Sequence, residues 1–219
     1  VWINHREVGM RNSLCVPHVY DLTSYATPGK SCLVTIRVDN RIKEINVGPD
    51  SHSITDQTQG NWNGIVGKIE LQSTPEVFFE DIQVYPDLAG KKALVRMNVR
   101  ASSSAKGEIA LSARSFNTNV NHEIAPVYQT VTVRKGDNPL EMELPMGQNF
   151  LTWDEFSPAL YRLTATLKNG KQIETKQVQF GMREFTINGK WFYVNGRKTM
   201  LRGTVENCDF PLTGYAPMD

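Results

Sequence analysis

Residues 153–180 read WDEFSPALYRLTATLKNGKQIETKQVQF, and this stretch decides the fold. Apolar and polar side chains alternate from Leu163 to Leu167, which is the pattern of a β-strand with one buried face. A turn-forming run at residues 168–171 follows, and the chain returns through the alternating residues 178–180. The stretch therefore predicts an antiparallel hairpin that closes a β-sandwich.

A second, shorter hairpin is predicted directly after the first. Asn188-Gly189 and Asn195-Gly196 are dipeptides of the kind that form two-residue turns between strands. The apolar pair Met200-Leu201 then runs into Arg202-Gly203 and a polar loop. We expect a new domain to begin there.

Strands also account for the rest of the chain. Alternation is clear in residues 32–38, 65–71, 77–84, 93–101, 108–116 and 130–133. Turn signals such as Pro28-Gly29 and residues 136–139 lie between these runs, and no convincing amphipathic helix is present. The sequence thus predicts an all-β protein with a sandwich of about seven strands, with a first domain boundary at Thr74-Pro75.

Composition and charge exclude several classes of partner. Of the 219 residues, 24 are Lys or Arg and 23 are Asp or Glu, and no basic stripe interrupted by aromatic residues occurs. A nucleic-acid partner is therefore not expected. No apolar run approaches the length of a membrane-spanning helix, and no cofactor is implied.

The cysteines and histidines do not form a recognisable metal or disulfide pattern. The three cysteines, Cys15, Cys32 and Cys208, are expected to be free thiols. Cys15 and Cys32 could face each other on neighbouring strands, but we predict that they do not form a disulfide. None of the histidines has a partner at i+2 or i+4, so no metal site is predicted; they are His5, His18, His52 and His122. His18 is expected to be a packed structural residue, and His52 is a candidate sugar contact or an exposed loop residue.

The order of these motifs resembles glycoside hydrolase family 2, the β-galactosidase and β-glucuronidase group. The resemblance rests on the Trp-Pro-Leu-Tyr segment at residues 153–161, the Gly-x-Arg at 181–183 and the Asn-Gly to Arg-Gly stretch at 195–203. It extends to the first 74 residues through the segments 1–9, 17–25, 33–40 and 62–65. Met182 replaces the usual aromatic residue, and Asp154-Glu155-Phe156 differs from the Ser-Pro-Glu that the family usually has at this place.

The resemblance implies three parts. Residues 1–74 would be the C-terminal part of a jelly-roll sugar-binding domain, 75–181 an immunoglobulin-like sandwich, and 182–219 a linker hairpin with the first strand and loop of a truncated (β/α)8 barrel. Val1–Asn4 already read as a strand, so we expect the sequence to enter the jelly roll partway.

The implied activity is hydrolysis of a terminal β-glycosidic bond, of a galactoside, glucuronide or mannoside, with retention. Retaining glycosidases need two carboxyl groups about 5–5.5 Å apart across the sugar. In the family both are glutamates late in the barrel, one of them in an Asn-Glu pair, and this chain has no such pair. By the resemblance, both catalytic residues lie after Asp219 and the fragment alone is expected to be inactive.

The resemblance also places possible substrate contacts in two loops. Glu206, Asn207 and Asp209 follow the first barrel strand, where barrel enzymes line the mouth of the active site. Asp56 and Asn61 lie in a polar loop that reaches the barrel mouth in relatives. The alternative is that these side chains only cap their own loops.

A different class, a stand-alone carbohydrate-binding or adhesion β-sandwich, is the alternative function. Such a module would bind sugars by stacking them on exposed aromatic rings, and the candidates are Trp2, Trp62, Trp153 and Trp191. Core burial is expected for Trp153 and Trp191. In the preferred interpretation the partner is an oligosaccharide or β-glycoside bound through the missing barrel. A half jelly roll would leave an edge open, so a homo-oligomer is also possible.

Overall fold

The computed structural model describes residues 1–13, 16–39, 64–65 and 67–204. Two compact units are present, one within residues 1–70 and one of residues 71–203. Every regular element in the described residues is a β-strand. The all-β class predicted from the sequence is therefore confirmed.

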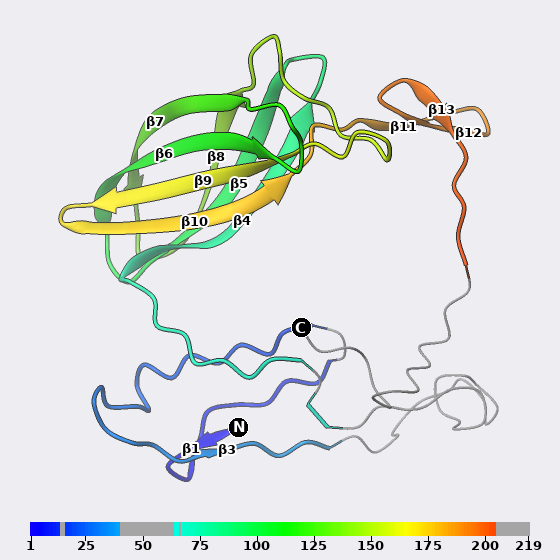
Figure 1. Ribbon diagram of the computed structural model, residues 1–219. Coiled ribbons are helices and arrows are strands. Elements are labelled where there is room, and N and C mark those ends of the chain that lie inside the picture. Colours follow the sequence, from blue (N-terminus) through cyan, green and yellow to red (C-terminus); the bar gives the residue numbers. More distant parts are fainter. Residues whose placement is uncertain (14–15, 40–63, 66, 205–219) are drawn as a thin grey trace. The chain divides into compact units, whose positions relative to one another are not determined.

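Seven long strands of the second unit form a sandwich of two antiparallel sheets. One sheet has the order β10-β9-β6-β7 and the other β4-β5-β8 (Figure 1). The strands are β4 (Val77–Asp87), β5 (Lys92–Ala101), β6 (Ala105–Phe116), β7 (Glu123–Val133), β8 (Gly136–Pro145), β9 (Leu160–Asn169) and β10 (Gln172–Phe180). This arrangement of four and three strands confirms the predicted immunoglobulin-like sandwich.

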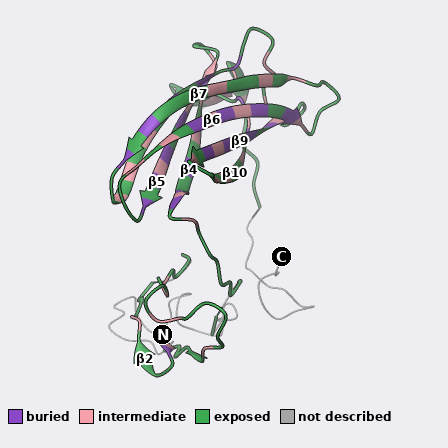
Figure 2. Cartoon of the chain, turned by 90° about the vertical axis from the view of Figure 1, so that its left-hand side faces the viewer, coloured by how far each residue is buried: buried purple, intermediate pink, exposed green. Residues whose placement is uncertain are grey.

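Alternation along these strands builds the core between the sheets. In β9, Tyr161, Leu163, Ala165 and Leu167 are buried, whereas the residues between them are half-buried or exposed. The same period of two appears as alternating buried and exposed bands on the strands in Figure 2. Each sheet thus has one apolar face, and the two faces bury each other.

The hairpins that the sequence predicts are present. Gln172 pairs with Asn169, so Gly170-Lys171 forms the turn between β9 and β10, and Gly170 has a φ of +59°. A separate sheet of three short strands follows, with the order β11-β12-β13. Its strands are β11 (Phe185–Asn188), β12 (Trp191–Val194) and β13 (Arg197–Thr199). We call it the small sheet.

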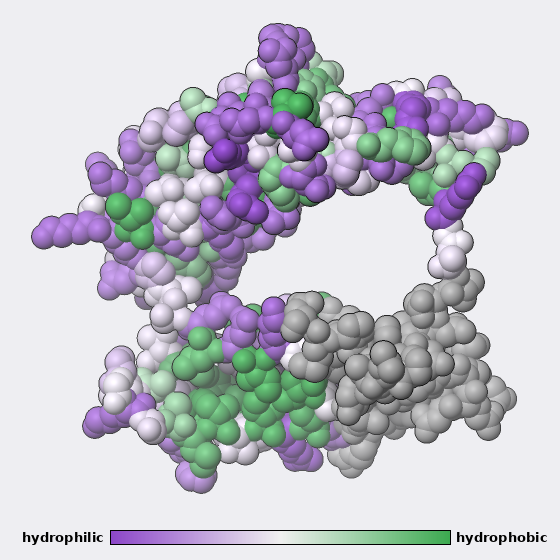
Figure 3. Space-filling model, viewed as in Figure 1, coloured by the Kyte–Doolittle hydropathy of each residue, from purple (hydrophilic) through white to green (hydrophobic). Residues whose placement is uncertain are grey.

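The first unit contains three two-residue strands in the order β2-β1-β3, namely β1 (Trp2–Ile3), β2 (Arg6–Glu7) and β3 (Val34–Thr35). Asn4 and His5 have positive φ and form the β1–β2 turn, and the Arg6 guanidinium lies 4.9 Å from the centre of the Tyr25 ring. Ile3 is buried, but Figure 3 shows a broad apolar area on this unit. Its exposed apolar residues include Met10, Val16, Val19, Leu33, Val34, Ile36 and Val38.

Two sequence predictions about strands are wrong. Residues 65–71 contain no strand in their described positions, and the predicted strand at 32–38 is reduced to β3. The predicted turn at 136–139 is instead the start of β8, since Asn138 pairs with Val99. The Asn138 amide supplies the turn by bonding the backbone of Arg134 in both directions, at 2.8 Å each. Pro139 is tolerated because β8 is an edge strand.

Two predictions about single side chains are also wrong. His18 is exposed, and its Nε2 shares a 2.9 Å hydrogen bond with Ser13 Oγ rather than packing in a core. Trp191 is 36% exposed because the small sheet has no apolar layer over this ring. Lys198 covers it instead, with Nζ 3.2 Å from the ring centre.

The edge between the two sheets is closed by side chains of β10. The register of β4 against β5 shifts between Phe79 and Asp81, which marks a β-bulge. Glu174 Oε2 accepts a 2.8 Å hydrogen bond from Phe79 N, and Lys176 Nζ donates to the carbonyl oxygens of Phe79 and Glu80 at 3.2 and 2.9 Å. These side chains thus supply hydrogen-bond partners for backbone N–H and carbonyl groups at the bulge.

Candidate functional site

The substrate contacts suggested by the sequence lie outside the described residues. These are Glu206, Asn207 and Asp209 after the small sheet, and Asp56 and Asn61 in the polar loop. His52 and Trp62 also lie outside them. The sites visible in the structure are therefore different ones.

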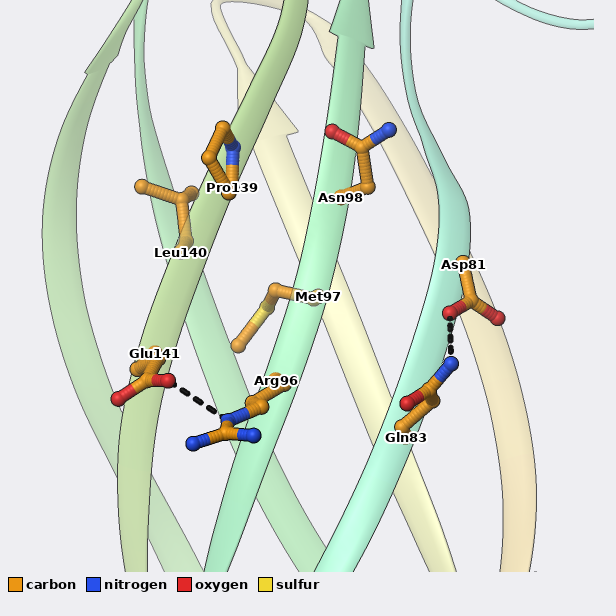
Figure 4. A pocket seen from close by; sticks show the side chains of 8 residues that line it. All are labelled: Asp81, Gln83, Arg96, Met97, Asn98, Pro139, Leu140 and Glu141. Atoms are coloured by element: carbon orange, nitrogen blue, oxygen red, sulfur yellow. Dashed lines mark hydrogen bonds and ion pairs between the residues drawn. The ribbon is translucent and has the colours of Figure 1, made fainter.

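A shallow groove crosses the outer face of the three-stranded sheet (Figure 4). Its polar lining comes from equivalent positions of three neighbouring strands, because side chains two residues apart lie on the same face. The residues are Asp81 and Gln83 of β4, Arg96 and Asn98 of β5, and Pro139 and Glu141 of β8. We call this the outer groove.

The charges of the outer groove are paired with one another. Arg96 Nε donates to Glu141 Oε1 at 2.7 Å, and Gln83 Nε2 donates to Asp81 Oδ2 at 2.8 Å. The Arg96 guanidinium also lies 5.0 Å from the centre of the Tyr85 ring. Exposed pairs of this kind contribute little to stability, but they leave few groups ready for a ligand.

One polar atom of the groove is buried without a hydrogen-bond partner in the described part of the chain, Asn98 Oδ1. The amide orientation is set by Glu80, whose Oε2 accepts a 2.8 Å hydrogen bond from Asn98 Nδ2. Asn98 pairs with Pro139 across the sheet, and a proline has no N–H to donate.

The outer groove does not have the geometry of a retaining glycosidase. Asp81 and Glu141 lie on β4 and β8 with β5 between them, so two strand spacings of about 4.8 Å separate their backbones. A retaining pair needs carboxyl groups about 5–5.5 Å apart. In addition, each of these two carboxylates already accepts a hydrogen bond from a neighbour. The groove is a paired polar surface.

Sequence reasoning did not find the outer groove. The alternating runs at 77–84 and 93–101 predicted two of its strands, but the third, β8, was interpreted as a turn at residues 136–139. The signal that could have found it is the alternation at Leu140, Met142 and Leu144, all directed to the core. The register that aligns three strands has no signature in the sequence.

The sandwich also holds one buried polar cluster. Tyr161 Oη accepts a 2.8 Å hydrogen bond from Leu151 N and shares another of 2.8 Å with His122 Nδ1. The Tyr161 ring stacks on Phe180, with 5.5 Å between ring centres. Burial raises the pKa of the Tyr161 hydroxyl above its ordinary value, and the Leu151 hydrogen bond opposes this. Tyr161 is fully buried, whereas His122 and Leu151 are half-buried, so the cluster ties the edge of the core together and has a structural role.

Three further observations concern the described residues alone. No group of three His, Cys, Asp or Glu side chains is placed to hold a metal ion. No helix there has the length and apolarity to span a bilayer. Cys32 is a half-buried free thiol, whereas Cys15 and Cys208 fall outside, so the absence of a Cys15–Cys32 disulfide stays a prediction.

Comparison with known proteins identifies the sandwich. Residues 77–183, which run from the start of β4 to just beyond β10, match the model of the family described as glycosyl hydrolases family 2. This sandwich is a glycosyl hydrolase family 2 domain. The resemblance inferred from the sequence motifs is thereby confirmed.

Relatives match nearly the whole chain but are much longer. It is 27% identical over 210 residues to a β-galactosidase of Priestia megaterium, covering 93% of this chain and 19% of that protein. It is 24% identical over 230 residues to a β-glucuronidase of Paenibacillus borealis, covering 98% of this chain and 36% of that protein. The chain thus spans about a fifth to a third of these relatives.

A solved structure agrees with the fold. The family 2 member from Bacteroides cellulosilyticus DSM 14838 superposes with a TM-score of 0.70 at 20% identity. The match covers 92% of this chain and 27% of that one. At this identity the likeness supports the fold of the chain.

Proposed function

We propose that this chain is the non-catalytic N-terminal portion of a retaining β-glycosidase that hydrolyses terminal β-glycosidic bonds. The observation that carries the proposal is the family 2 match, which lies on the complete sandwich. The sequence has no Asn-Glu pair of the kind that carries the family's acid/base glutamate. The catalytic carboxylates would then lie in the part of the protein after Asp219.

The role of the sandwich in this proposal is to connect and support other domains. Two observations favour such a role. Its interior is filled by apolar side chains such as Val95, Leu111 and Leu163, which are fully buried. On its outer surface the carboxylates are largely engaged by neighbouring Lys and Arg, as in the Arg100–Glu80 pair at 2.9 Å. A rigid sandwich with a paired surface suits a spacer between a jelly roll and a barrel.

Under the same proposal, two loops of this chain contact the glycoside. Asp56 and Asn61 would come from the jelly-roll part, and Glu206, Asn207 and Asp209 from the start of the barrel. Carboxylates and amides suit these positions because they can accept or donate hydrogen bonds to neighbouring sugar hydroxyls.

The first experiment compares this 219-residue chain with the same gene extended to its natural stop codon, on a panel of chromogenic β-galactosides, β-glucuronides and β-mannosides. We expect turnover only by the long form, and the preferred glycoside then names the substrate class. Turnover by the short form at a comparable kcat would contradict the proposal, because it would place the catalytic carboxylates within these residues.

The loop contacts are tested in the long form by Asp56→Ala. Loss of a hydrogen bond to a sugar hydroxyl should raise KM several-fold, with kcat changed less and with an unchanged melting temperature. Asp50→Ala, in the same polar loop, is the matched control and should leave KM as it is. Equal KM values for the two variants would mean that Asp56 does not contact the substrate.

The alternative of a sugar-binding module receives little support from two of the tryptophans that the structure describes, Trp153 and Trp191. Lys198 Nζ covers one face of the Trp191 ring at 3.2 Å, and the Arg183 guanidinium lies 4.8 Å from the Trp153 ring centre. Each has a face occupied by a cation, where a sugar would have to stack. Binding of a simple sugar by this chain at millimolar or tighter affinity, in an NMR line-broadening titration, would favour the module instead.

A further inference from the structure

The loop between β8 and β9 is closed on itself by one carboxylate. Asp154 Oδ1 accepts hydrogen bonds from Phe156 N at 2.8 Å and Ser157 N at 2.9 Å, and Asp154 N donates to Ser157 O at 3.1 Å. The two N–H donors lower the pKa of the Asp154 carboxyl because they favour its charged form. Residues 153–157, which we call the joint loop, therefore form a compact turn with a defined shape.

The joint loop is attached to the end of the sandwich. Trp153 N donates to Met182 O at 3.0 Å, just after β10, and Thr152 forms an isolated parallel bridge with Met182. Gly181 lies so close that a Cβ there would come within 2.9 Å of Trp153 Cβ. Met182 itself is fully buried against the core. The loop is thus anchored on the sandwich side.

The side chain of Asn195 connects the joint loop to the small sheet. Asn195, in the β12–β13 turn, has a φ of +50°. Its Nδ2 donates to Trp153 O at 3.0 Å, while its Oδ1 accepts from Glu184 N at 2.9 Å and its backbone N donates to Glu184 O at 2.9 Å. One asparagine therefore bonds the sandwich loop, the turn of the small sheet and the residue that precedes β11.

Charged side chains reinforce the same contact. Arg197 Nη2 donates to Glu155 Oε1 at 2.8 Å, and the Arg197 guanidinium lies 4.8 Å from the centre of the Phe156 ring. The side chain of Phe156 is 78% exposed, and the small-sheet arginine lies over its ring. The arginine thus engages both the carboxylate and the ring of the joint loop.

We propose that Asn195 and Arg197 lock the small sheet onto the joint loop, so that the small sheet and the sandwich move as one rigid body. The small sheet has a single buried apolar residue, Val194, and no core of its own that would set its orientation. Its orientation is therefore set by these polar contacts. In the intact enzyme the lock would fix the direction in which the chain leaves β13, and this consequence rests on the proposed function.

The lock is tested by residual dipolar couplings of backbone amides in the 219-residue chain, independently of any enzymatic activity. In the unmodified chain, β4–β10 and β11–β13 should fit one alignment tensor. The double variant Asn195→Gly/Arg197→Ala should need two, because glycine keeps the left-handed turn but loses the amide bonds. The exchange of the Glu184 amide should also quicken roughly three- to tenfold.

Lys198→Ala is the matched control, since Lys198 lies beside Arg197 on β13 but its ammonium group lies over the Trp191 ring of the small sheet itself. It should keep the common tensor. Two tensors in the unmodified chain, or one tensor in the double variant, would overturn the lock. If the double variant does not fold, Glu155→Ala is measured instead, because it removes only the ion pair with Arg197. This variant should increase the amplitude of motion of the small sheet relative to the sandwich. An unchanged amplitude would also overturn the lock.

Discussion

The sandwich and the small sheet are both antiparallel, but they are stabilised by different means. Strands of the sandwich reach 12 residues, and side chains such as Ile109 and Leu163 are fully buried between two sheets. Strands of the small sheet have three or four residues, and Ile187 and Phe185 are 67% and 48% exposed. A short strand can therefore form without a buried face, whereas a second apolar layer is needed to make a core.

The largest expected effect comes from removing core volume in the sandwich. Leu163→Ala should lower the free energy of unfolding by about 2–5 kcal/mol, through lost burial and a cavity. Ile187→Ala in the small sheet removes a similar side chain from an exposed position and should cost about 0.5 kcal/mol or less. Urea denaturation of both variants measures the difference. Similar losses would mean that the small sheet buries its apolar face after all.

A smaller effect is expected from the buried polar cluster, which the small sheet lacks. Tyr161→Phe leaves Leu151 N and His122 Nδ1 without their partner and should cost about 1–3 kcal/mol. Tyr85→Phe is the control, because Tyr85 is 42% exposed and its hydroxyl contacts only the Gln83 side chain. The control should change the free energy by about 0.5 kcal/mol or less. An unchanged free energy of unfolding for Tyr161→Phe would show that the cluster does not contribute to stability.

The smallest expected effect concerns pH and the bulged edge of the sandwich. Burial raises the pKa of Glu174, and the Phe79 N–H and Lys176 only partly oppose it. A raised carboxyl pKa contributes stability that is present below the unfolded-state pKa of about 4.3 and is lost as pH rises through the folded value.

Glu174→Gln keeps an oxygen that can accept from Phe79 N but cannot ionise. It should therefore be more stable than the unmodified chain at pH 7, by less than about 1 kcal/mol, and the difference should shrink at pH 3. Thermal unfolding at both pH values measures this. Glu108→Gln, at an exposed position of β6, should show no such pH dependence. A larger stabilisation at pH 3 would reverse the assigned sign.

Much of the sandwich could be predicted because its signals are local. The dipeptide at 195–196 forms a turn of the small sheet, and those at 169–170 and 188–189 overlap by one residue the turns at 170–171 of the sandwich and 189–190 of the small sheet. The strand β8 was missed because Asn138 and Pro139 are usual turn residues. Only their long-range pairing, of Asn138 with Val99 and Pro139 with Asn98, shows that they begin a strand instead.

The candidate sites were less predictable. The outer groove requires a register between β4, β5 and β8, and a register depends on pairing partners far apart in the sequence. The exposure of Trp191 was not predicted, because an apolar run indicates burial only if another layer covers it. The proposed loop contacts at Asp56, Asn61, Glu206, Asn207 and Asp209 remain predictions.

The sequence by itself determined the all-β class, the turns of the short hairpins and the resemblance to family 2, since each depends on residues close together in the chain. The tertiary structure alone decided which strands share a sheet, how Glu174 closes the bulged edge and how Asn195 joins the small sheet to the sandwich. The physical reason is distance along the chain. These contacts join residues 42 to 95 positions apart, and no local preference specifies such a pairing.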